Sequence, residues 1–301
     1  MPPVLPMSFK TLLRYRYSPV TQRPDYSWPD GKRLAVYLAL NVEQYKFGEG
    51  LIEELVRSPD QPDVLNYSWC DYGTRVGVWR LLELMEEFRI PVTLLVNSDL
   101  YAACPGVVDA FRERGDEIAC HGRTNKERQG SMSGDAERAL IEEATSVLEK
   151  HEGKRPAGWL SPWISETNLT PDLLQAAGYR YVLDWCSDDQ PFWLRTTGGP
   201  LLAVPYPQEL NDSSTVIGRF MSAADFADMI VDNFDEMLRQ SVRQPLVMGI
   251  ALHAHISGQP FRLSHLRRVL AHLDAKRSEY WLTRAGSIAD HVSQLLPIPA
   301  Q

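Results

Sequence analysis

The chain has 301 residues, of which 44% are hydrophobic and 23% are charged, so it is long enough to bury the core of one large α/β domain. A formal net charge of -8 and the lack of any long basic stretch leave no electrostatic footprint for nucleic acid or a membrane surface, and they disfavour polyanionic substrates. The N-terminal residues lack a charged segment followed by an apolar one, so we expect no export signal, and no apolar run approaches the roughly 20 residues of a membrane span. We therefore expect a cytoplasmic protein whose four cysteines are free or buried thiols.

The first thirty residues differ from the rest of the chain. They are rich in Pro, Tyr and Arg and show neither helical nor alternating periodicity, which predicts an extended arm over residues 1–30. Such an arm packs on its own domain or on a neighbouring subunit, and it favours a homo-oligomer. Residues 31–301 show no linker, repeat or low-complexity segment, so we expect them to form a single domain.

After the arm, strand patterns and helix patterns alternate along the chain. Strands are predicted at 34–40, 92–96, 117–120, from 159, and at 181–183, 204–206, 246–252 and 281–283. Helices are predicted at 77–88, 106–114, 133–150, 170–177, 223–239 and 263–275. This alternation predicts an α/β fold in which about seven parallel strands form a distorted, closed or nearly closed (β/α) barrel, with the functional site at the C-terminal strand ends.

Three ionisable side chains come at the ends of predicted strands. Glu43 follows the run 34–40, His121 lies between the third strand and Gly122, and His253 ends the run 247–252. Hydrolysis of an amide needs an activated water, donors for the developing oxyanion and an acid for the leaving nitrogen, and these residue types supply such groups. We predict that Glu43 activates the water and that His121 and His253 act on the carbonyl and the leaving group. A buried salt bridge and a core histidine are the structural alternatives.

Other polar and aromatic residues are candidates for substrate binding. Adjacent carboxylates beside aromatic residues suit a ring that carries N–H donors, although a solvated turn has the same composition. A lone arginine at a helix start can bind a carbonyl or form a salt bridge. The candidates are Arg75, Trp163, Asp188, Asp189, Trp193, Asn211, Asp212 and His255.

Several short motifs occur in a characteristic order. They are Leu40 to Glu43, Asp71 to Leu82, Gly115 to Gly122, Arg155 to Trp159, Asp188 to Trp193, Val204 to Asp212 and Ala251 to Pro260. In this order they resemble the polysaccharide deacetylase superfamily over roughly residues 30–295, and they are most similar to its cofactor-independent allantoinase branch and cyclic-imide-hydrolysing relatives. The resemblance implies a distorted barrel of parallel strands and a hydrolase of a carbon–nitrogen bond other than a peptide bond.

The resemblance also shows where this chain departs from metal-binding deacetylases. Their Asp-Asp pair is replaced by Asn41-Val-Glu43, and their His-x-x-x-His pair by His121-x-x-x-Asn125. If an ion binds, Glu43, His121 and Asn125 are the expected ligands. Because a neutral amide is a poor substitute for imidazole toward zinc, we predict no tightly bound cofactor, with a divalent metal such as zinc as the alternative.

Three functions remain open from the sequence. The leading one is ring-opening hydrolysis of a small cyclic amide such as allantoin, hydantoin or a cyclic imide. The second is metal-dependent N-deacetylation of an acetylated sugar or polysaccharide, which the altered ligand set and the expected cytoplasmic location weaken. The third is an inactive homologue that binds a small ligand in the same pocket.

Overall fold

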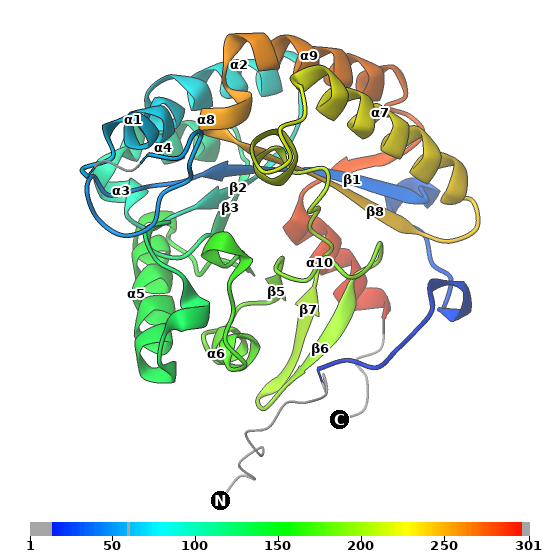
Figure 1. Cartoon of the computed structure of the whole chain (residues 1–301). Helices are drawn as coiled ribbons and strands as arrows, with labels where there is room; N and C mark the ends of the chain where they lie inside the picture. Colours follow the sequence, from blue (N-terminus) through cyan, green and yellow to red (C-terminus); the bar gives the residue numbers. More distant parts are fainter. Residues whose placement is uncertain (1–13, 59–60, 297–301) are drawn as a thin grey trace, which may run out of the picture.

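The structure, a computed structural model, describes residues 14–58 and 61–296. Within these residues nine strands form one curled sheet in the order β6-β7-β5-β4-β3-β2-β1-β8, and β9 also pairs with β1 (Figure 1). Their bounds are β1 Leu34–Val42, β2 Val92–Val96, β3 Glu117–Cys120, β4 Gly158–Trp159, β5 Tyr181–Val182, β6 Phe192–Thr196, β7 Gly199–Ala203, β8 Leu246–His253 and β9 Trp281–Thr283. All pairings are parallel except that of β6 with β7. The sheet forms a half-barrel, which confirms the predicted deacetylase-like fold class.

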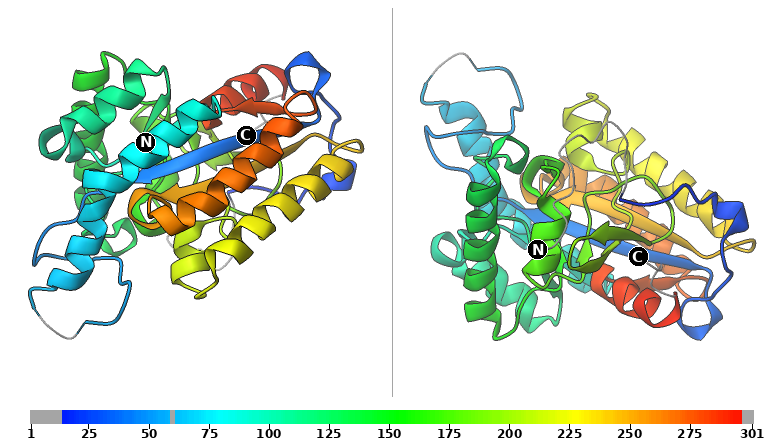
Figure 2. Two further views of the ribbon diagram at one scale, coloured as in Figure 1. Left: turned by 90° about the horizontal axis from the view of Figure 1, so that it is seen from above. Right: turned by 90° about the horizontal axis from the view of Figure 1, so that it is seen from below.

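Helices cover the convex face of the sheet and fill part of its concave side. They are α1 Val64–Tyr72, α2 Val78–Glu87, α3 Leu100–Ala103, α4 Pro105–Glu113, α5 Gly134–Glu152, α6 Thr170–Ala176, α7 Ala223–Gln240, α8 Ala254–Ser257, α9 Pro260–Ala275 and α10 Ala285–Leu295. Helices α2, α7 and α9 lie along one side of β1 and β8, and α10 lies on the other side (Figures 1 and 2). None of the described helices combines the length and apolar character that crossing a membrane requires.

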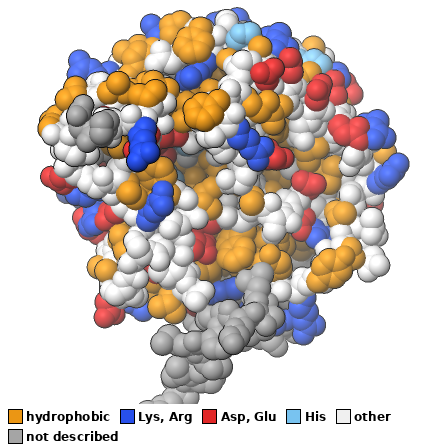
Figure 3. Space-filling model, in the orientation of Figure 1, with side chains coloured by type: hydrophobic (Ala, Val, Ile, Leu, Met, Phe, Trp, Pro, Cys, Tyr) orange, Lys and Arg blue, Asp and Glu red, His pale blue; other side chains and the backbone are white. Residues whose placement is uncertain are grey.

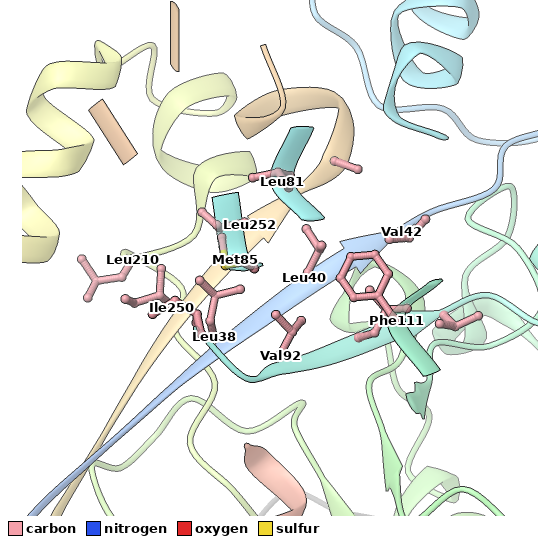
Figure 4. Packing of buried hydrophobic residues seen from close by; sticks show 14 of the residues in the cluster. Leu38, Leu40, Val42, Leu81, Met85, Val92, Phe111, Leu210, Ile250 and Leu252 are labelled. Atoms are coloured by element: carbon pink, nitrogen blue, oxygen red, sulfur yellow. The ribbon is translucent and has the colours of Figure 1, made fainter. Parts of the chain in front are cut away.

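Alternation along the central strands separates two cores. Even-numbered residues of β1 and β8, such as Leu38 and Leu252, pack with Leu81 and Met85 of α2 (Figure 4). Odd-numbered residues, such as Tyr37, face the concave side and belong to a second cluster that includes residues of α10. Because successive side chains of a strand point to opposite faces, the next odd-numbered residues beyond the strand ends also face the concave side.

The described part of the N-terminal arm runs along the molecule without an α-helix or strand. It contains two short 3-10 turns, Val20–Gln22 and Pro29–Gly31. Trp28 is 1% exposed, and its indole N–H donates to the Leu246 carbonyl at 3.0 Å. Residues 1–13 of the predicted arm lie outside the described residues.

Most predicted elements are present, and one is wrong. The six predicted helices occur within three residues of their expected ends, and strands 92–96, 117–120 and 281–283 match β2, β3 and β9. Residues 204–206 follow β7 rather than form a strand. Val204 adds one more hydrogen bond, to Val182, and then Pro205 lacks the N–H that the ladder needs.

The surface agrees with the modest net charge. On the face drawn in Figure 3, acidic and basic side chains are interspersed with apolar ones and form no large patch of one sign.

Candidate active site

The C-terminal ends of three central strands bring the predicted catalytic residues together. In the sheet register Asn41 of β1 lies beside His253 of β8, and Val42 connects through β2 to Cys120 of β3. Glu43 and His121 each follow one residue later, on the concave side. Glu43, His121 and His253 line a cavity of about 140 Å³.

Glu43 is buried among hydrogen-bond donors. Its Oε1 accepts from the Asn125 amide at 2.6 Å and lies 3.4 Å from His121 Nε2 and 3.6 Å from His253 Nε2. Its Oε2 accepts from the Tyr45 hydroxyl at 2.6 Å. Burial disfavours the charged carboxylate, but the charge of His253 and the hydrogen bond and charge of His121 outweigh it and lower the pKa of Glu43 well below its usual value. Glu43 is therefore ionised at neutral pH.

His253 is backed by a buried carboxylate. Its Nδ1 lies 2.6 Å from Asp212 Oδ1, while Asp212 Oδ2 accepts from the His253 backbone N–H at 2.9 Å and from the Ser257 hydroxyl at 2.6 Å. Burial lowers the pKa of His253, but the charges of Glu43 and Asp212 dominate and raise it to about 10. His253 is thus an imidazolium at neutral pH, and its Nε2–H faces Glu43 and the cavity.

His121 has a defined tautomer. Its Nδ1 lies 2.8 Å from the carbonyl oxygen of Leu160, which can only accept, so Nδ1 carries a proton. Nε2 is then the ring nitrogen that faces Glu43 and the cavity.

A chain of amides fixes the orientation of Asn125. The backbone N–H of Gln44 donates to Asn97 Oδ1 at 2.7 Å, so the Asn97 amino group must point the other way. It donates to Asn125 Oδ1 at 3.1 Å, and Asn125 consequently turns its own amino group toward Glu43.

This orientation decides whether the superfamily's metal fits the expected ligands. At the position of the second metal-binding histidine, Asn125 presents N–H groups, which cannot ligate a cation. Glu43, His121 and Asn125 therefore do not fit a metal ion. A different group of the described residues, Glu43, Glu53 and His255, has ligand atoms within 4.8 Å of one another and could hold a divalent ion.

Sequence reasoning missed Glu53, Tyr45 and Tyr206, which also line the cavity. Glu53 lies in a segment without regular structure, where no periodicity marks it, whereas Tyr206 belongs to the Val204 to Asp212 motif. The Tyr206 hydroxyl accepts from the Asn41 amide at 2.9 Å. Burial raises the pKa of Tyr206 well above its usual value, so the hydroxyl keeps a proton to donate. Asn41 Oδ1 is buried without a partner among the described residues.

The remaining candidates divide into two groups. Trp163 and Asn211 line the cavity, while Asp212 and His255 lie one step behind it, paired with His253 and Glu53. The structure does not bring the other four candidates to the cavity. Arg75 is on the surface beside Asp71, Asp188 pairs with Arg23 at 2.5 Å, Asp189 accepts through its backbone carbonyl from Val247, and Trp193 lies within the β6–β7 hairpin.

One wall of the cavity has strained backbone. Trp163 and Ile164 both adopt left-handed conformations, with φ of 62° and 50°. Such angles are unfavourable for non-glycine residues and above all for a β-branched one. The indole N–H of Trp163 donates to the Asn125 carbonyl at 2.8 Å, which ties this wall to the amide chain.

A larger hollow of about 630 Å³ lies at the opposite edge of the sheet, near the start of β3 and β5. Its charged side chains largely satisfy one another, as in the pairs Arg180 with Asp290 and Arg112 with Glu152. It contains none of the predicted catalytic residues.

Several known proteins are similar to this chain in fold or in sequence. The model of the polysaccharide deacetylase family matches residues 61–182. The crystal structure of PuuE allantoinase is 29% identical, covers 95% of this chain and 100% of its own, and has a TM-score of 0.83. A Pseudomonas aeruginosa PAO1 structure described as a probable polysaccharide deacetylase is 27% identical, with coverage of 92% and 96% and a TM-score of 0.83.

A curated relative gives the same result. A Schizosaccharomyces pombe protein with the provisional name polysaccharide deacetylase is 25% identical over 299 residues, which span 88% of this chain and 91% of the relative. These similarities support a hydrolase of the deacetylase kind. The chain carries a polysaccharide deacetylase domain, and its structural neighbours include a probable polysaccharide deacetylase and an allantoinase, as the motifs predicted.

Proposed function

We propose that the protein hydrolyses a non-peptide carbon–nitrogen bond and opens a small cyclic amide such as hydantoin, allantoin or a cyclic imide. The observation that carries this proposal is the pairing of an ionised Glu43 with a protonated His253 in a small cavity where Asn125 donates to Glu43. A base and an acid thus face the same space.

The reaction follows from these positions. A water attacks the ring carbonyl carbon while Glu43 accepts its proton, and the carbonyl oxygen becomes an oxyanion that receives hydrogen bonds from His253 and Tyr206. The carbon–nitrogen bond then breaks, and His253 Nε2 gives its proton to the leaving nitrogen. Transfer of the proton from Glu43 to His253 restores the site. The product carries a carboxyl group and the freed nitrogen on one open chain.

The strong donors around Glu43 make it a weak base in the free site. A substrate carbonyl that takes over the hydrogen bond from His253 removes that donor from Glu43, and the pKa of Glu43 then rises toward that of an effective base. His253 thereby couples substrate binding to the activation of water.

Cavity size and leaving-group chemistry favour a small ring. The cavity of about 140 Å³ is below the roughly 300–1,000 Å³ of pockets for drug-sized ligands. The nitrogen of an imide or cyclic ureide leaves as a stabilised anion, so a base and oxyanion donors suffice. The similarity to an allantoinase over nearly the whole chain supports the same substrate class.

The second candidate is N-deacetylation of an acetylated sugar. The names of the Pseudomonas and Schizosaccharomyces relatives favour it, and an acetamido group alone would fit the cavity. An ion held by Glu43, Glu53 and His255 would then be needed in place of the superfamily's usual ligands.

A turnover assay on hydantoin, allantoin, succinimide and an N-acetylated chitooligosaccharide, with and without a chelator, tests both candidates. We expect ring opening that resists the chelator, and no release of acetate. The substitution Glu43→Gln should lower kcat by roughly 10²–10⁴-fold, the usual contribution of a general base, while ring binding persists. Acetate release that a chelator abolishes would replace this proposal with the second candidate.

A further inference from the structure

Two carboxylate–imidazole pairs flank the cavity with opposite polarity. In the first pair His253 lines the cavity and Asp212 lies behind it. In the second pair Glu53 lines the cavity, and His255 lies behind it with Nε2 at 2.7 Å from Glu53 Oε2. The cavity therefore offers a donor from one pair and an acceptor from the other.

The hydrogen bonds around Glu53 show that it acts as an acceptor. The Ser213 hydroxyl donates to Glu53 Oε1, and His255 Nε2 donates to Oε2. Each carboxylate oxygen accepts at more than one lone pair, so capacity remains toward the cavity. His255 donates from Nε2, a nitrogen that could otherwise ligate a metal. Glu43 accepts hydrogen bonds from Asn125 and Tyr45. The three possible ligands Glu43, Glu53 and His255 therefore belong to a hydrogen-bonded network.

The segment that carries Glu53 is fixed at several points. The side chain of Asn66 in α1 accepts from the backbone N–H of Leu55 at 2.9 Å and donates to the Val56 carbonyl at 2.9 Å. Two residues before Glu53, the N–H of Leu51 donates to the Lys126 carbonyl at 2.8 Å. The acceptor is thus held in place before a ligand arrives, which reduces the ordering cost of binding.

We propose that Glu53 is a specificity-determining residue that accepts a hydrogen bond from an unsubstituted ring N–H next to the carbonyl that His253 polarises. This inference rests on the proposed ring opening and names its substrate class. A ring holds its amide in the cis form, so the N–H and C=O point from the same edge and can meet Glu53 and His253 together. An acyclic acetamide is trans and points them to opposite sides.

The test compares succinimide with N-methylsuccinimide in three proteins: wild type, Glu53→Ala, and Glu54→Ala as a matched control. Glu54 is exposed and lies next to Glu53 in the same segment. We measure kcat/KM for both compounds, and their Kd by calorimetry in a Glu43→Gln background with and without Glu53→Ala. Thermal unfolding of each variant confirms that it folds.

Wild type and Glu54→Ala should prefer the N–H compound by roughly tenfold or more, as expected for a hydrogen bond to a charged group. In Glu53→Ala this preference should fall toward the ratio of the uncatalysed reactions. An unchanged preference in Glu53→Ala would overturn the inference, as would a stoichiometric zinc ion bound by wild type and lost in that variant. If the N–H compound binds selectively through Glu53 but no ring opens, the inference survives and the proposed function fails.

Discussion

At the scale of single residues, the site depends on a buried pair of opposite charges. Glu43 and His253 lie 3.6 Å apart, and each favours the charged form of the other. Asp212 adds a second negative charge on the far side of the imidazole. The protonation state needed for catalysis is therefore maintained across the neutral range.

This arrangement predicts an unusual pH profile. The pKa of His253 is raised from 6.5 to about 10, so kcat/KM should hold steady through neutral pH and fall as pH rises through about 10. The pKa of His253 is higher in the folded protein than in the unfolded chain. The stability that its charge contributes is therefore fully present below pH 6.5 and is lost as pH rises through about 10. The substitution Asp212→Asn removes a charge that raises this pKa and should move the alkaline limb of kcat/KM to lower pH. An alkaline limb that stays in place would show that another group controls it.

The sequence identified Glu43, His121 and His253 because each ends an apolar strand, a position that local patterns reveal. It could not identify Glu53, whose position depends on the contacts of Asn66 with its segment and on its own contact with His255, far along the chain. The sequence also could not predict the orientation of the Asn97 and Asn125 side-chain amides, because an asparagine can place its oxygen or its nitrogen on either side.

At the scale of elements, two glycines allow the short helix α8 to pack closely beside the site. Gly73 and Gly77 bound a π-helical turn between α1 and α2. A Cβ on Gly77 would lie 2.0 Å from the Ala254 carbonyl oxygen, and one on Gly73 would lie 2.8 Å from the His255 backbone nitrogen. Helix α8, which follows His253 directly, thus packs closely against the backbone of Gly73 and Gly77.

The substitution Gly77→Ala should push α8 away from this turn and misplace both His253 and His255. We expect a loss of roughly 1–3 kcal/mol of stability from overpacking, together with a fall in kcat. Urea unfolding and steady-state kinetics measure the two effects. Gly106→Ala in α4 is the control, because a Cβ there meets nothing within 4 Å. Equal behaviour of the two variants would contradict the proposed role of this contact.

Some of the elements that the sequence missed are short or lack a clear start in the sequence. Helix α8 has only four residues and is stabilised by its neighbours. Helix α10 begins at Ala285 after Arg284, which provides no side-chain cap, so no capping residue marks its start. Long amphipathic helices such as α7 could be predicted because their own pattern specifies both the helix and its buried face.

At the scale of the whole molecule, the open side of the half-barrel is joined by irregular segments. Strands β6 and β8 are not paired with each other within residues 14–58 and 61–296. Instead, the Asp189 carbonyl accepts from Val247 at 2.8 Å, the Gln190 side chain donates to the Pro245 carbonyl at 2.7 Å, and Arg23 of the arm pairs with Asp188. The sequence could not show that Asp188 forms an ion pair rather than a binding site, because its partner Arg23 lies far away in the chain.

The contact of Arg23 with Asp188 and the burial of Trp28 predict that the arm stabilises the fold. Trp28 stacks on Trp281, with ring centroids 5.8 Å apart. The substitution Trp28→Ala should therefore cost about 3–5 kcal/mol, the range for a fully buried large side chain. Urea unfolding gives the value, and Tyr17→Ala, at a residue that is 90% exposed, should change it by less than about 0.5 kcal/mol. Similar losses in both variants would argue against a stabilising role of Trp28.

The amide chain also determines how readily the site could return to metal chemistry. A histidine introduced at position 125 would meet the amino group of Asn97, so the ring nitrogen on that side would have to accept, and the proton would sit on the nitrogen facing Glu43. That is the wrong tautomer for a ligand, because a metal-binding imidazole donates its other N–H to an acceptor. Asn97 would have to become an acceptor, such as aspartate, at the same time. At position 125 alone, two coordinated substitutions would therefore be needed to present a metal-binding imidazole, and neither of them would be sufficient by itself.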